Sequence, residues 1–198
     1  NTDANLAFMV DSINANISDL NRFVSFCQTH SYIGRFMNYT GASSASPALT
    51  ACERLSDEYR QSPVNSYMHR IIIGNSYDRY LQIVDPTYST SQNVAKLTKA
   101  LDIYDSQLSS QGLDFTTGYI ADPYIDRTSE NVLILIQPIA YQYSFRQGGY
   151  VAVSLLEDFF TAPMHYYSIA DDSFLYLTLG SHVYRMKDGS LTELDISD

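Results

Sequence analysis

The sequence predicts an α+β fold in which a long N-terminal helix packs along an antiparallel sheet flanked by helices. Apolar residues recur at helical spacing from Leu6 to Cys27, which predicts the long helix. Short β-branched and aromatic runs fill residues 119–156, and two more lie between residues 70 and 84. Gly, Pro, Asp, Ser and Asn separate these runs, as is typical of consecutive antiparallel strands joined by turns.

The first helix is predicted from apolar residues that step alternately by four and three positions. They are Leu6, Val10, Ile13, Ile17, Leu20, Val24 and Cys27. This is the a/d spacing of a coiled-coil seam, which predicts a parallel dimer. A single amphipathic helix that covers its own sheet accounts for the spacing equally well.

The remaining elements follow from local periodicity and turn residues. Helical spacing predicts further helices near 31–39, near 47–61 and between Ser91 and Gly112, and a short helix broken near Pro163. Short alternating runs predict hairpins at 70–84 and 174–186, each joined by a turn that contains glycine. We expect no regular element after the turn at 187–190.

Three strands between Tyr119 and Leu156 form the expected centre of the sheet. Val132–Ile136 is apolar without alternation, so both of its faces are expected to be buried, as in a central strand. Pro138 cannot donate a hydrogen bond, so the ladder is expected to end or loosen at Gln137–Pro138.

Composition restricts the classes of protein. A chain of 198 residues suggests one domain, or one domain and a fragment of a second. The net charge of −10 argues against binding to nucleic acid, which needs clustered Lys and Arg. No apolar run approaches the roughly 18 residues that a membrane span requires. Because the chain begins with Asn, we expect it to be a piece of a longer protein.

No pattern for catalysis or metal binding emerges. The sequence lacks a phosphate-binding loop, a dinucleotide fingerprint and a cysteine pair at metal-ligand spacing. Paired acids at Asp122 and Asp126 could act in a glycosidase, but acids that shape turns explain them without catalysis. Cys27 and Cys52 could form a disulfide, although two separate thiols are favoured. We therefore expect no enzyme activity, no cofactor and no metal.

A binding site is the remaining functional signal. Tyr119, Tyr124 and Asp126 lie at the exit of a predicted strand, next to a buried sheet. Aromatic faces and a carboxylate in a concave site would suit a small polar ligand. The alternative is that the tyrosines belong to the core and that Asp126 shapes the turn.

This order of elements resembles the PAS-like Cache sensor fold. The resemblance rests on Asp122-Pro123-Tyr124-Ile125-Asp126, the strand Val132–Ile139 and the run Gly149–Leu155. They look like the family's Asp-Pro-Tyr-x-Asp turn, its penultimate strand and its Gly-aliphatic final strand. Residues 172–191 look like the opening hairpin of a second, membrane-proximal Cache unit. The resemblance implies an N-terminal helical region at 1–62, a membrane-distal sheet unit at 63–166, and the start of the second unit at 167–198.

Such domains form the extracellular part of bacterial receptors. The chain looks most similar to the sensors of YesM-type histidine kinases, which implies a membrane-anchored parallel homodimer of a two-component system. A ligand-dependent change would pass through the N-terminal helix. The alternatives are the sensor of a chemoreceptor or diguanylate cyclase, a secreted carbohydrate-active enzyme, or an adhesion module.

The resemblance also assigns residues to the site. Tyr124 and Asp126 match the family's turn, Tyr119 precedes it, and Ser154 aligns with an acid that meets a ligand's amino group. The Arg-x-Trp-Tyr stretch that amino-acid sensors carry is missing at 112–118. These departures disfavour α-amino acids as ligands. We expect another small polar metabolite, a sugar, or a ligand-loaded binding protein.

Overall fold

The computed structural model describes residues 2–38, 45–74, 80–84, 115–121, 131–140, 147–167, 170, 173–179 and 182–195. The helical elements are α1 (Thr2–Thr29), α2 (Ser31–Met37), α3 (Ala45–Gln61), η1 (Asn65–Tyr67), α5 (Asp158–Thr161) and η2 (Ala162–His165). The strands are β1 (Met68–Gly74), β2 (Tyr80–Val84), β3 (Phe115–Ala121), β4 (Asn131–Ala140), β5 (Gln147–Leu156), β6 (Leu175–Leu179), β7 (His182–Lys187) and β8 (Ser190–Leu194).

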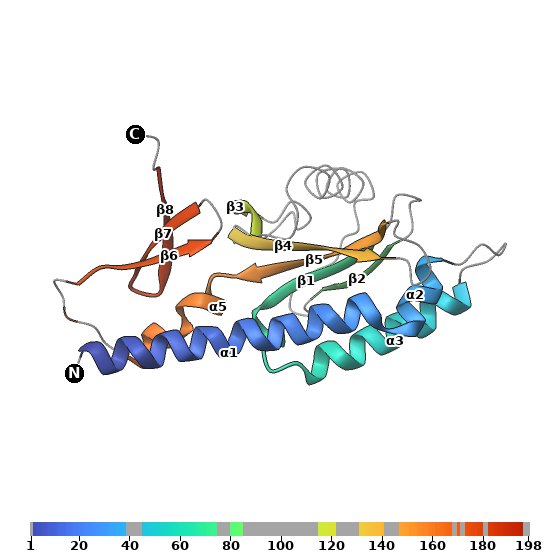
Figure 1. Ribbon diagram of the computed structural model, residues 1–198, viewed down its shortest axis with the longest axis horizontal. Helices are drawn as coiled ribbons and strands as arrows, with labels where there is room; N and C mark the ends of the chain where they lie inside the picture. The colour runs from blue at the N-terminus through green and yellow to red at the C-terminus, as the bar shows by residue number, and fades with distance from the viewer. Residues whose placement is uncertain are drawn as a thin grey trace.

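The predicted α+β fold is confirmed. Five strands form an antiparallel sheet in the order β2-β1-β5-β4-β3, here called the large sheet. β6, β7 and β8 form a second antiparallel sheet, here called the small sheet. Helix α1 runs the length of the molecule beneath the large sheet, and α5 lies between the two sheets (Figure 1). β5 therefore leads directly from the large sheet toward the small one.

The central strand is confirmed. The ladder does not end at Gln137–Pro138, although its register with β5 shifts just beyond, between Ile139 and Ala140. β4 lies between β5 and β3, and Val132–Ile136 is fully or almost fully buried. Its ladder with β5 continues past Pro138, which pairs with Tyr150, to Ala140. The ladder with β3 extends only as far as Leu135. Beyond Leu135, β4 pairs only with β5 among the described residues. Pro138 therefore lies where β4 is an edge strand, and an edge strand tolerates a residue without an amide donor.

Helix α1 covers its own sheet with the C-terminal half of the apolar stripe. Leu20, Val24 and Cys27 are buried in a cluster with the residues of β4 and β5 that face the helices. Leu6 and Val10, in the N-terminal half, are 40% and 48% exposed. The amphipathic interpretation therefore describes most of the stripe, and a parallel dimer through its N-terminal half stays a prediction.

Side-chain contacts attach α1 to the rest of the chain at several points along its length. Near its C-terminus, the Gln28 amide donates a hydrogen bond of 2.9 Å to the carbonyl of Pro138 in β4. In the middle of the helix, the Asn16 amide donates one of 2.9 Å to the carbonyl of Phe159 in α5. Near its N-terminus, Phe8 stacks on Tyr167, with ring centroids 5.5 Å apart. We call α5, which lies between the two sheets, the junction. A single helix thus contacts the large sheet, the junction and the segment that leads to the small sheet.

The expectation of no element after residue 190 is wrong, because β8 pairs with β7 from Ser190 to Leu194. Asp188 and Gly189 have φ angles of 51° and 80°. Positive φ at both central residues is the requirement of the two-residue hairpin turn that Asp-Gly favours. The backbone amide of Leu191 donates a hydrogen bond of 3.1 Å to the carboxylate of Glu157, which joins β8 to the end of β5.

The helix predicted between Ser91 and Gly112 lies outside the described residues. Within the described ranges, no helix is both long enough and apolar enough to cross a membrane.

The two cysteines occupy different environments and are free thiols. Burial raises the pKa of the Cys27 thiol well above its ordinary value, and the nearby Glu58 carboxylate raises it further. Cys52 in α3 is half-buried.

We expect Ellman's reagent to label Cys52 at least about tenfold faster than Cys27 in the folded protein, because the reactive species is the thiolate. The measurement compares the Cys27→Ser and Cys52→Ser variants at pH 8. In urea, where both thiols are exposed, the two variants should react at similar rates. Equal rates in the folded state would contradict the buried position of Cys27.

Candidate functional site

The large sheet has a second face, which points away from α1. Side chains alternate along a strand, and the residues that contact the helices take one set of alternate positions in β1, β5 and β4. The other set forms what we call the Arg70 face. Its residues are Arg70, Ile72, Ile134, Ile136, Tyr150, Ala152 and Ser154.

The Arg70 face is buried although it carries polar groups. In β5, Ser154 is 2% exposed and lies between Arg70 of β1 and Ile134 of β4 in the strand register. Arg70 itself is 6% exposed. A guanidinium and a hydroxyl therefore lie side by side on a surface that is otherwise mostly aliphatic.

Arg70 gives this face its chemical character. Burying a guanidinium is costly unless hydrogen bonds or an opposite charge compensate it. Its planar fork of donors matches the two oxygens of a carboxylate or the oxygens of a phosphate. Arg70 was not predicted as a site residue from the sequence. The available signal was an arginine inside the strand Met68–Gly74, whose other residues except His69 are apolar or glycine.

A second polar group lies at the far end of β1. Tyr150 pairs with Gly74 and is 2% exposed. A β-carbon added at Gly74 would lie 3.0 Å from the Tyr150 hydroxyl oxygen, so glycine allows the ring to lie over the end of β1. Arg70 and Gly74 are four residues apart, which corresponds to about 13 Å along a strand. The face thus presents polar groups at the two ends of an apolar floor.

The structure places two of the four predicted site residues. Ser154 lies on the Arg70 face, as described above. Tyr119 lies in β3, two strands from β5 in the large sheet, and its side chain is not among the described ones. Tyr124 and Asp126 lie outside the described residues, so their assignment to the site stays a prediction.

The described residues give no support for catalysis by a metal or by paired acids. In the ranges given above, no group of three or more His, Cys, Asp or Glu side chains could hold a metal ion. The acid pair Asp122 and Asp126 falls outside them.

Comparison with known proteins gives structural matches only. No family model matches the chain, and no curated protein matches it. Three solved structures of the Campylobacter jejuni chemoreceptor Tlp3 align with most of it. The ligand-binding domain with 4-methylisoleucine has 11% identity and a TM-score of 0.45, and the alignment covers 93% of this chain and 85% of that one. The sensory domain with isoleucine has 12% identity and a TM-score of 0.46, with coverages of 92% and 86%. The ligand-binding domain with L-valine has 12% identity and a TM-score of 0.45, with coverages of 92% and 87%. Because these TM-scores lie below 0.5, the functional proposal rests on the chain's own residues.

Proposed function

We propose that this chain is the extracellular sensing domain of a bacterial transmembrane receptor and that it is not itself an enzyme. The observation that carries the proposal is the placement of α1. One continuous helix is attached to the large sheet through Gln28, to the junction through Asn16 and to the segment before the small sheet through Phe8. A movement of the large sheet can therefore reach the N-terminus of the helix without crossing a flexible connection.

The Arg70 face supplies the ligand site in this proposal. A small molecule held there would contact β5 at Ser154, while the opposite face of β5 packs on α1 through Val153 and Leu155. A ligand that prefers one arrangement of β5 shifts the population toward that arrangement. The helix then carries the change as a small rotation or translation along its axis.

The residues restrict the ligand class. Ser154 carries no charge, so it cannot pair with a ligand's ammonium group as an acid would. The guanidinium of Arg70 and the hydroxyls of Ser154 and Tyr150 suit hydroxyl or anionic groups instead. We therefore propose a small polar metabolite or a sugar, with a ligand-loaded binding protein as the alternative. We assign the output to a YesM-type histidine kinase, and a chemoreceptor is an equally supported output.

A thermal-shift screen against sugars, organic acids and amino acids tests this function. A ligand at a hundred times its Kd adds about 2.7 kcal/mol of stability, which raises the Tm by roughly 5–10 °C for a chain of this size. We expect the shift to fall in Ser154→Ala, Tyr124→Ala and Asp126→Ala. It should persist in the control Tyr166→Ala, whose side chain is 83% exposed.

Other outcomes of the screen would overturn the proposal. If no compound raises the Tm, direct binding of a small molecule is wrong. Chemical turnover of the stabilising compound would instead support the carbohydrate-active enzyme. An equal loss of the shift in the control and in the three site variants would place the ligand elsewhere.

A further inference from the structure

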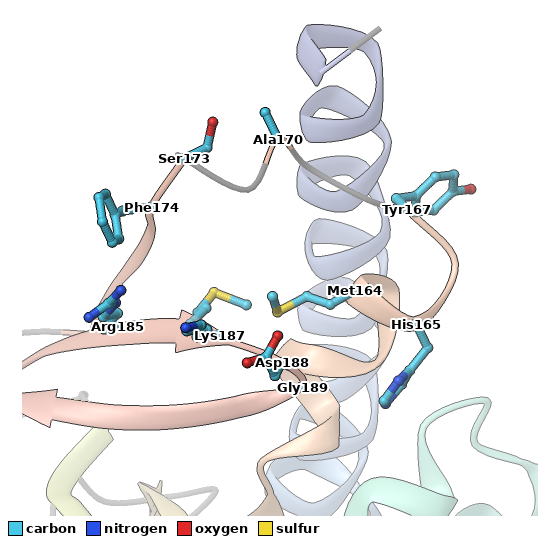
Figure 2. Close-up of a pocket in the computed structure, with 11 residues that line it drawn as sticks. Met164, His165, Tyr167, Ala170, Ser173, Phe174, Arg185, Lys187, Asp188 and Gly189 are labelled. Atoms are coloured by element: carbon cyan, nitrogen blue, oxygen red, sulfur yellow. The ribbon is translucent and has the colours of Figure 1, made fainter.

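A separate cavity lies at the end of the small sheet. It has a volume of about 620 Å³ and lies between η2, the described residues Tyr167, Ala170 and Ser173, and the end of β7 with its turn to β8 (Figure 2). Its lining residues include Met164, Tyr167, Phe174, Arg185, Lys187 and Asp188. We call it the Arg185 cavity. None of these residues belongs to the Arg70 face.

The lining of the cavity carries positive charge. Arg185 and Lys187 project from alternate positions of β7, and Asp188 in the adjoining turn is the one acid among the described residues that line the cavity. The side chains of Arg185, Lys187 and Asp188 together sum to one positive charge. The whole chain has a net charge of −10, so a positive lining is a local exception. A single negative charge would neutralise it.

Arg185 is positioned to bind an anion. Its guanidinium carbon lies 4.5 Å from the centroid of the Phe174 ring, and this contact orients the guanidinium group. Its Nε atom is shielded from solvent and has no hydrogen-bond partner among the described residues. A buried N–H donor without an acceptor is unfavourable, and a carboxylate oxygen would satisfy it.

The rest of the lining is mixed, with His165 and Ser173 as polar side chains beside an apolar part. Met164, Met186, Ala170 and Phe174 supply thioether, methyl and aromatic surface. Methionine side chains adapt to irregular apolar shapes, so they accommodate a short hydrocarbon group. A cavity of this size with a few convergent polar groups is typical of a small-molecule site.

We propose that the Arg185 cavity binds a small organic monocarboxylate with an apolar tail. The carboxylate pairs with Arg185 and Lys187, and the tail lies against Met164 and Phe174. Such a ligand would act close to α1, because the lining residue Tyr167 stacks on Phe8 of that helix. The cavity is thus a second input to the same helix, distinct from the Arg70 face.

Isothermal titration calorimetry with isovalerate tests the site, with isovaleramide as an uncharged analogue of similar shape. We expect saturable binding of isovalerate to the wild type and no binding of the amide. Arg185→Gln and Lys187→Gln should each weaken binding at least about tenfold. The control Arg60→Gln should bind like the wild type, since the Arg60 side chain is 69% exposed and α3 lies toward the other end of the molecule from the small sheet (Figure 1).

Each contrary result has a definite meaning. Absence of saturable binding at millimolar isovalerate, or equal binding of the amide, overturns the proposal. Unchanged affinity in both β7 variants does so as well. Circular dichroism establishes whether each variant folds. The Lys187 side chain is exposed, so Lys187→Gln is expected to fold and still tests the site if Arg185→Gln does not fold. Binding that is retained in Ser154→Ala separates this site from the Arg70 face.

Discussion

Gly149→Ala is expected to destabilise the protein by about 3 kcal/mol, at the upper end of the cost of overpacking a core. A β-carbon at this position would lie 2.2 Å from the carbonyl oxygen of Gly74 and 2.2 Å from the terminal methyl of Met37. The methionine side chain can move aside. The carbonyl of Gly74 belongs to the backbone of β1, so β1 and β5 would have to separate.

Gly34→Ala is the matched control for this substitution. Gly34 lies within α2, and a β-carbon added there would meet no atom within 4 Å. Alanine is better than glycine in a helix by about 0.5–1 kcal/mol, so this variant should be slightly more stable than the wild type. Urea unfolding of the two variants should therefore give changes of opposite sign. Similar changes would show that the close approach of β5 to Gly74 is wrong.

The effect of Gly149→Ala would extend to the proposed ligand site. Gly149 precedes Tyr150, which forms one end of the Arg70 face and pairs with Gly74. Separation of β5 from β1 at this end would move Tyr150 relative to Arg70. We expect ligand affinity to fall along with stability in this variant.

Features that depend on local spacing could be predicted from the sequence. The first helix was predicted from seven apolar residues between Leu6 and Cys27, and the structure has α1 from Thr2 to Thr29. The central strand followed from Val132–Ile136, because an unbroken apolar run needs burial on both faces. Helices α2 and α3 also lie close to their predicted ranges.

Features that depend on distant pairing could not be predicted. Arg70 joins the proposed site only because β1 pairs with β5, which sets it opposite Ser154 across more than eighty residues of sequence. No local pattern encodes that neighbour. Similarly, the tolerance of Pro138 depends on where β3 stops, and this is a property of the sheet rather than of β4. β8 was missed because the strand has only five residues and most of them are exposed.

Phe159→Ala is expected to cost about 4 kcal/mol, the middle of the range for truncating a buried phenylalanine. Phe159 is fully buried in α5, at the junction between the two sheets. Its ring meets Phe160 edge-on at a centroid distance of 4.8 Å and Tyr67 at 6.1 Å. Truncation would leave a cavity and remove both aromatic contacts. Urea denaturation of the variant and of the exposed control Tyr166→Ala measures the difference.

This substitution also tests the route by which a signal would travel. The carbonyl of Phe159 accepts the hydrogen bond from Asn16, so the position of α5 determines where the middle of α1 is held. If α5 loosens, a ligand on the Arg70 face should still bind but should affect the N-terminal half of α1 less. Hydrogen exchange of α1 amides, with and without the stabilising ligand, measures that coupling. Full coupling in a folded Phe159→Ala variant would mean that the signal reaches α1 through Gln28 and β4 instead, because these contacts do not pass through α5.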